Sequence, residues 1–113
     1  MPNSEIKLQV LVRLLNKPHV SQRGLASELG VSLGSVNYCL KELVAKGFVK
    51  AENFSKSSNK LGYSYLLTPS GVREKSKLTA LFLKRKQAEY YSLKREIEEL
   101  KAQVEQDKNH GNN

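Results

Sequence analysis

The stretch SQRGLASELGVSLGSVNYCLKELVAKG, from Ser21 to Gly47, decides the fold. Ser21 and Ser32 stand where a helix N-cap is expected, and Gly30 and Gly47 stand where helices commonly end. Two helices joined by a tight turn containing glycine are typical of a helix-turn-helix motif, whose second helix enters the major groove of DNA. The stretch therefore predicts a short helix followed by a recognition helix.

The expected recognition helix, residues 33–46, has two different faces at about 100° per residue. Its apolar face consists of Val36, Leu40, Leu43 and Val44. The opposite face carries Gly34, Tyr38, Lys41 and Ala45, with Ser35 and Asn37 at its flanks. We expect the polar face to stay exposed because a DNA groove occupies it.

Five residues of this helix are the candidates for reading bases: Gly34, Ser35, Asn37, Tyr38 and Lys41. Asn37 can form a bidentate pair with adenine, and Ser35 can bond a base or a phosphate. Tyr38 can stack or reach a phosphate, and Gly34 permits close approach of the backbone. The alternative is a solvated helix face beside a protein partner.

Before this motif, apolar residues at helical spacing predict a first helix that Asn3 or Ser4 caps and that ends near Asn16. Its apolar positions are Leu8, Leu11, Val12 and Leu15. Pro18 breaks the pattern, so that residues 17–20 are expected to form a turn and a short strand.

After the motif, residues 48–54 and 63–68 are rich in β-forming residues and should pair as a hairpin. The polar loop between them, SKSSNKLG, suits an exposed wing, although a bland surface loop would look similar. Phosphate contacts are expected from the start of the second helix and from the wing: Ser21, Gln22, Arg23, Lys50, Lys56, Asn59 and Lys60. Each of these lysines could equally be solvated.

Thr68 precedes a proline, which predicts the start of a last, long helix. A heptad pattern within it gives a short coiled coil formed by Leu83, Tyr90, Leu93, Ile97, Leu100 and Val104. The charged flanks favour a parallel homodimer weakly, because each Glu would meet a Lys of the partner. Alternatively, Tyr90 and Tyr91 could pack back on the first domain. The basic cluster 84–86 could touch flanking DNA or remain solvated.

The net charge is +8 and the isoelectric point is about 9.7. Residues 1–75 hold eleven Lys and Arg against five Glu, a net charge of +6, and the remainder holds eight against six acidic residues, a net charge of +2. Such a field attracts polyanions, nucleic acid first and an anionic membrane second.

Several classes of protein are disfavoured by the sequence. The single cysteine, Cys39, permits no internal disulfide and no cysteine cluster for zinc, and we expect it to be buried as a small apolar side chain. His19 and His110 lack companions spaced for metal binding or catalysis, so no enzyme, metal or cofactor is predicted. The N-terminus is too charged for a signal peptide and no run is long enough to span a membrane, which indicates a cytoplasmic protein.

Residues 21–71 resemble the MarR-like winged-helix regulators, and most closely their short subgroup associated with exopolysaccharide gene clusters. The resemblance is carried by SLGSVNY, LVAKGFVKAENF and NKLGYSYLLTPSG, and then by FLKRKQAEYYSLKREIEEL in the long helix. It implies transcriptional control near polysaccharide-synthesis genes. The chain lacks the additional helices of larger MarR proteins and the usual Asp-x-Arg pattern of their wing, which argues against small-molecule sensing.

The expected fold is mainly α with a small β-hairpin. A winged helix-turn-helix domain over 1–75 would be followed by a dimerisation helix over 76–108 and a disordered tail over 109–113. The expected partners are double-stranded DNA and a second copy of the chain. The rival functions are a protein-interaction adaptor that lacks specific DNA binding and an RNA-binding adaptor, for which the aromatic stacking platform is lacking.

Overall fold

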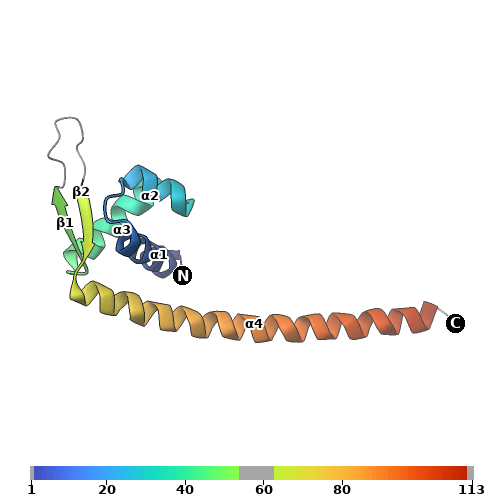
Figure 1. The fold of residues 1–113 in the computed structure, drawn as a ribbon. Coiled ribbons are helices and arrows are strands. Elements are labelled where there is room, and N and C mark those ends of the chain that lie inside the picture. Colours follow the sequence, from blue (N-terminus) through green and yellow to red (C-terminus); the bar gives the residue numbers. More distant parts are fainter. Residues whose placement is uncertain (1, 54–62, 112–113) are drawn as a thin grey trace. The chain divides into compact units, whose positions relative to one another are not determined.

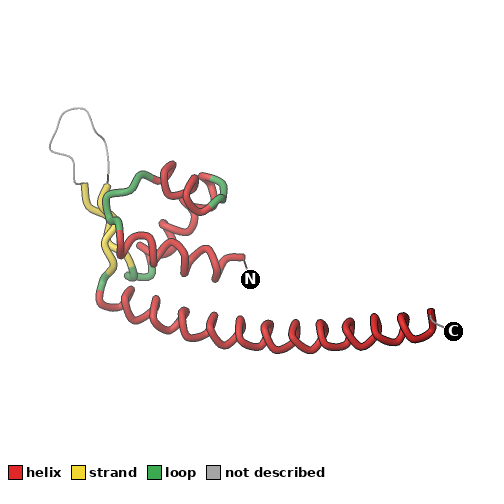
Figure 2. Tube along the Cα trace, turned by 45° about the vertical axis from the view of Figure 1, so that its right-hand side comes forward, coloured by secondary structure: helices red, strands yellow, loops and turns green. Residues whose placement is uncertain are grey.

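A computed structural model of the 113-residue chain describes residues 2–53 and 63–111 (Figure 1). The elements in chain order are α1 (Pro2–Asn16), α2 (Gln22–Leu29), α3 (Leu33–Ala45), β1 (Val49–Asn53), β2 (Tyr63–Leu67) and α4 (Pro69–Gly111). The tube view shows the helices in red and the two strands of the hairpin in yellow (Figure 2). The predicted fold class, a winged helix-turn-helix domain with a long C-terminal helix, is confirmed.

The caps predicted for the central motif are confirmed. The Ser21 side chain accepts a hydrogen bond from Gly24 N at 2.9 Å, and Ser32 Oγ accepts one from Ser35 N at 3.1 Å. Gly30 ends α2 in the left-handed region with φ 67°, where a side chain would be strained. These local signals fix the ends of α2 and the start of α3.

The N-terminal helix differs from the prediction. It begins at Pro2, so the expected cap positions, Asn3 and Ser4, lie inside α1. Its fully buried residues include Leu14, whereas Leu15, one of the apolar positions that define the predicted face, is 49% exposed. Six apolar residues between 8 and 15 surround much of the helix, and packing against α3 and β2 selects which of them are buried.

The short strand expected over 17–20 is not observed, and within residues 2–53 and 63–111 the sheet has two strands. The carbonyl oxygen of Pro18 accepts a hydrogen bond from Tyr65 N at 3.1 Å. Proline has no N–H to return such a bond, so this position cannot pair reciprocally with β2. The segment thus touches the sheet without extending it.

The core lies between α1, α2, α3 and the hairpin. Its buried apolar residues are Val10, Leu11, Leu14, Leu25, Ala26, Val36, Cys39, Leu40, Leu43, Val49, Tyr65 and Leu78. The burial predicted for Cys39 is confirmed, but Val44, predicted to be part of the apolar face of α3, is 41% exposed. At about 100° per residue Val44 lies some 40° beyond Leu40, away from the centre of the buried stripe.

The hairpin pairs β1 with β2 in antiparallel register, with Val49 opposite Leu67 and Ala51 opposite Tyr65. Val49 and Tyr65 are buried, so this side of the hairpin faces the core. Residues 54–62 lie outside the described part of the chain, and so do three predicted wing residues: Lys56, Asn59 and Lys60.

The last helix is capped by Thr68, as expected. Thr68 Oγ1 accepts a hydrogen bond from Gly71 N at 3.0 Å and donates one to the Gly47 carbonyl oxygen at 2.6 Å. The chain divides into two compact units, residues 1–79 and 80–113. Helix α4 continues to Gly111, into the segment for which the sequence predicts a disordered tail.

Within the second unit, the residues predicted to form a coiled coil are all exposed, from 44% for Ile97 to 61% for Leu100. Their heptad spacing places them along one side of the helix. In the part of the chain that the structure describes, no helix combines the length and the apolar character that crossing a bilayer requires.

Candidate nucleic-acid interface

The outward face of α3 is open, as the sequence predicts. Tyr38 is 60% exposed, and Gly34, Lys41 and Ala45 are exposed beside it. Ser35 and Asn37 are half-buried at the two edges of this face. The fold therefore leaves the side of the helix that bears Tyr38 accessible to a ligand from solvent.

One edge of this face forms a groove with α2 and the hairpin, which we call the α3–hairpin groove. Its volume is about 340 Å³, and its lining includes Gln22, Asn37, Lys41, Val44, Ala51 and Tyr65. Three segments that are separate in the sequence thus meet around the exposed edge of α3. Of the predicted contact residues, the groove brings together Gln22, Asn37 and Lys41.

The N-terminus of α2 is held against the hairpin at this groove. Gln22 Nε2 donates a hydrogen bond to Tyr65 Oη at 3.1 Å. Ser21 caps the same helix end, and Arg23 is exposed next to it. A helix N-terminus with its unpaired backbone N–H groups favours an anion, so the three predicted phosphate ligands lie together at a suitable place.

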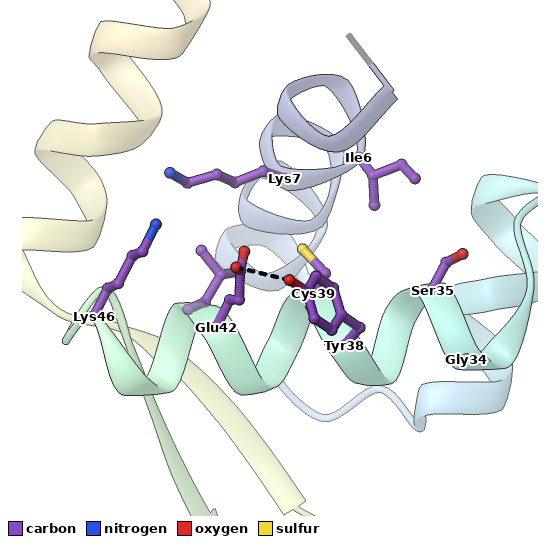
Figure 3. Close-up of a pocket in the computed structure, with 9 residues that line it drawn as sticks. Ile6, Lys7, Gly34, Ser35, Tyr38, Cys39, Glu42 and Lys46 are labelled. Atoms are coloured by element: carbon purple, nitrogen blue, oxygen red, sulfur yellow. Dashed lines mark hydrogen bonds between the residues drawn. The ribbon is translucent and has the colours of Figure 1, made fainter.

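The other edge of the exposed face of α3 borders a cavity of about 250 Å³ beneath the N-terminal part of α1 (Figure 3). Gly34, Ser35 and Tyr38 line it together with Ile6 and Lys7. The five predicted base-reading residues are therefore divided, because Asn37 and Lys41 line the groove and the other three line the cavity.

A carboxylate outside the predicted set of contact residues lies on this second edge. Glu42 Oε2 accepts a hydrogen bond from Tyr38 Oη at 3.2 Å, drawn as the dashed line in Figure 3. This hydrogen bond and the negative charge of Glu42 raise the pKa of the Tyr38 hydroxyl. The spacing of four residues on a helix could have identified the pair.

Two hydroxyl groups at the start of α3 are engaged with each other. Ser32 Oγ donates a hydrogen bond to Ser35 Oγ at 2.9 Å while it accepts one from Ser35 N. Ser35 is thus part of the helix cap. Its hydroxyl can donate to DNA without disturbing this arrangement, because a hydroxyl group both donates and accepts.

Lys50 occupies a different side of the hairpin from the groove. Alternation along β1 places Ala51 toward α3 and Lys50 on the opposite face, where Lys50 Nζ lies 3.3 Å from Glu52 Oε2. Both side chains are largely exposed. A phosphate contact by Lys50 stays a prediction, and it would involve the outer face of the wing.

The thiol of Cys39 is buried between α3 and α1, and burial raises its pKa to about 11. The negative charge of Glu42 acts in the same direction. A thiol in this environment remains protonated at neutral pH. The described residues include no cluster of three or more His, Cys, Asp or Glu side chains that could hold a metal ion.

Comparison with known protein families matches residues 3–50 to the winged helix-turn-helix DNA-binding family. The match covers α1, α2, α3 and the start of β1. A comparison with curated protein sequences found no match.

Solved structures of MarR regulators share the fold. Apo MarR from E. coli is 25% identical, with a TM-score of 0.57 over 66% of this chain and 54% of that one. A MarR transcriptional regulator from Methanosarcina mazei Go1 is 20% identical, with a TM-score of 0.63 over 77% of this chain and 61% of that one. A mutant of E. coli MarR complexed with operator DNA is 25% identical, with a TM-score of 0.54 over 66% of this chain and 52% of that one.

The chain thus carries a winged helix-turn-helix domain of the kind found in MarR-family transcriptional regulators. It spans only a little over half the length of the E. coli protein.

Proposed function

We propose that the chain is a sequence-specific regulator of transcription that binds double-stranded DNA as a homodimer. The observation that carries the proposal is the α3–hairpin groove, where the N-terminus of α2, the exposed edge of α3 and the base of the wing meet. In winged-helix readers these three parts contact a phosphate, the base edges and the neighbouring backbone, respectively.

In this proposal α3 lies in the major groove with its exposed face toward the base pairs. Asn37 pairs with adenine, and Lys41 reaches a guanine or a phosphate. The N-terminus of α2 binds a phosphate oxygen through its backbone N–H groups and the side chains of Ser21, Gln22 and Arg23. Tyr38 and Gly34 complete the contact on the side of the cavity, and the wing residues Lys56, Asn59 and Lys60 contact the backbone.

The second copy of the chain would bind along the apolar stripe of α4. The stripe residues are exposed in the single chain, although side chains such as Leu93, Ile97 and Leu100 gain free energy when they are removed from water. A helix of this kind, long and apolar on one side only, is typical of a coiled coil.

A parallel arrangement fits the stripe best. Ile97 and Val104 occupy one core position of the heptad and Leu93 and Leu100 the other, and in a parallel coiled coil this choice of β-branched and leucine residues favours two strands. In a parallel pair, Glu96 also meets Lys101 of the second copy, whereas a centred antiparallel pair would bring like charges together. The dimer would place two recognition helices in successive major grooves, roughly 34 Å apart, on a pseudo-palindromic site.

The resemblance to the short regulators associated with exopolysaccharide gene clusters indicates which genes the protein would control. We expect the operator to lie near genes for polysaccharide synthesis. Fragments selected by the protein from its own genome would map to such promoters, and enrichment of unrelated promoters would contradict this part of the proposal.

A gel-shift series tests the reading face. Asn37→Ala and Tyr38→Ala are expected to relax the sequence preference, whereas Lys56→Ala is expected to weaken binding to all duplexes alike. Arg95→Ala serves as a control, because it removes a positive charge from an exposed position of α4 that is outside the proposed interface. If the first two variants bind every duplex as the wild-type protein does, the proposed reading face is wrong.

Salt dependence separates this function from a protein-interaction adaptor. A protein that contacts six or more phosphates loses affinity by a factor on the order of 10³ between 50 and 200 mM salt. Competition with duplex RNA separates DNA binding from RNA binding. Weak binding with a shallow salt dependence would favour the adaptor.

A further inference from the structure

Val44 is an apolar side chain at the exposed edge of the recognition helix. It belongs to α3, yet it is 41% exposed, while its neighbours Leu40 and Leu43 are 2% and 1% exposed. It lines the α3–hairpin groove, next to Ala45 and across from Ala51. The groove therefore has an apolar part at the C-terminal half of the recognition helix.

Val44 and Asn37 lie on the same side of α3, because seven residues correspond to almost two complete turns. Their positions along the helix axis differ by about 10 Å at a rise of about 1.5 Å per residue. Successive bases of a DNA strand are about 3.4 Å apart. If α3 follows the major groove, the two side chains contact base pairs that are about three positions apart.

The chemistry of the major groove determines what an exposed valine recognises there. All four bases present hydrogen-bonding atoms there, and thymine alone also presents a methyl group, at C5. Valine has no polar atom with which to bond the other bases. We propose that Val44 is a specificity-determining residue that reads a thymine through its methyl group, about three base pairs from the adenine read by Asn37.

Charge complementarity favours a DNA duplex as the ligand of the groove. The inference therefore rests on the proposed function. Lys41 lines the same groove, and residues 1–75 carry a net charge of +6. An apolar patch with positive charge at its side suits a thymine flanked by phosphates. It suits an apolar protein surface less well, because Lys41 would then lose its water without gaining a partner.

The test uses the full-length protein and the duplex that it selects from a random pool. Each thymine of the selected site is replaced in turn by deoxyuridine, which lacks only the methyl group. At one position in each half-site the replacement is expected to weaken binding of the wild-type protein about four-fold, the effect of about one buried methyl group. Val44→Ala is expected to bind the thymine and deoxyuridine duplexes equally.

Val72→Ala is the matched control, since Val72 has the same side chain and the same exposed fraction, 41%, and lies on α4. This variant is expected to keep the four-fold preference for thymine. A specific site at which no thymine methyl matters, or at which Val44→Ala retains the preference, would overturn the inference and leave the proposed function intact. Failure to select any preferred duplex would overturn both.

Discussion

Lys7 Nζ lies 2.9 Å from Glu74 Oε2, and this ion pair joins α1 to the beginning of α4. Both side chains are mostly buried, with 21% and 17% of their surface exposed. Lys7 also lies over the ring of Phe48, 5.1 Å from its centroid. A mostly buried pair of this kind is screened less by solvent than an exposed one, so it contributes measurably to stability.

The pair makes the stability of the domain depend on pH. The hydrogen bond from Lys7 lowers the pKa of Glu74, and partial burial opposes this effect. Because the pKa is lower in the folded protein than in the unfolded chain, where it is about 4.3, the stabilisation is present above pH 5 and lost as the pH falls through the folded value. Glu74→Gln is expected to lower the free energy of unfolding at pH 7 by about 1 kcal/mol.

Urea unfolding at several pH values measures this difference between wild-type protein and variant. The difference is expected to be constant from pH 6 to 8 and to shrink below about pH 4. The exposed Glu105→Gln is the control and should change the stability by less than about 0.5 kcal/mol. An equal difference at pH 3 and pH 7 would mean that the charge of Glu74 does not contribute.

Gly71 lies against the backbone of Phe48, and this contact forbids a larger residue. A Cβ atom at position 71 would come within 1.9 Å of the Phe48 carbonyl oxygen, which already accepts a hydrogen bond from Thr68 N. Gly71→Ala must move the start of α4 and is expected to destabilise the domain by about 2 kcal/mol. Gly111→Ala, with no atom within 4 Å of its Cβ, should leave the unfolding midpoint in urea nearly unchanged.

Local signals in the sequence predict much of this fold. The caps at Ser21 and Ser32 and the glycine stop at Gly30 depend on neighbouring residues alone, and the structure has all three. The buried side of α1 could not be predicted in the same way. Apolar residues surround that helix, and whether Leu14 or Leu15 is buried depends on where α3 and β2 pack.

The sequence predicts only the part of the candidate site that depends on neighbouring residues. Helical spacing identifies the exposed face of α3 because Tyr38 and Lys41 share it. Spacing does not reveal that Ala51 and Tyr65 close the other side of a groove, because those residues come from strands that are distant in the sequence. The spacing places Val44 on the apolar face of α3, since an apolar residue at the edge of a stripe looks the same whether it packs inward or lines a binding surface.

A substitution at Gly34 is expected to change the stability of the domain and its affinity for DNA in opposite directions. It lies in the first turn of α3 with its Cβ position open, the nearest atom being Ser32 Oγ at 4.0 Å. Alanine is the better helix former, so Gly34→Ala is expected to stabilise the domain by roughly 0.5–1 kcal/mol. If the backbone approaches DNA here, the same variant loses affinity in a gel-shift titration. Greater stability with unchanged affinity would show that Gly34 does not contact DNA.

Cys39 is expected to be unreactive in the folded protein. Its thiol is buried and has a pKa of about 11, so the thiolate fraction at pH 8 is about 100-fold lower than in an unfolded chain. Labelling with a chromogenic disulfide at pH 8 should therefore be slow and should accelerate on adding urea above the unfolding midpoint. Rapid labelling without urea would instead indicate an accessible thiol.

The orientation of the α4 pair can be tested by cross-linking in a Cys39→Ala background. Val104 lies near the end of the apolar stripe, so in a parallel dimer the two copies of this position face each other across the core. Val104→Cys is therefore expected to form a disulfide-linked dimer on mild oxidation, because the two Cβ atoms come within range of a disulfide. In a centred antiparallel dimer the same two positions would lie at opposite ends. Ala102→Cys, on the outer side of the helix, is the control, and cross-linking of that variant alone would exclude the parallel stripe as the interface.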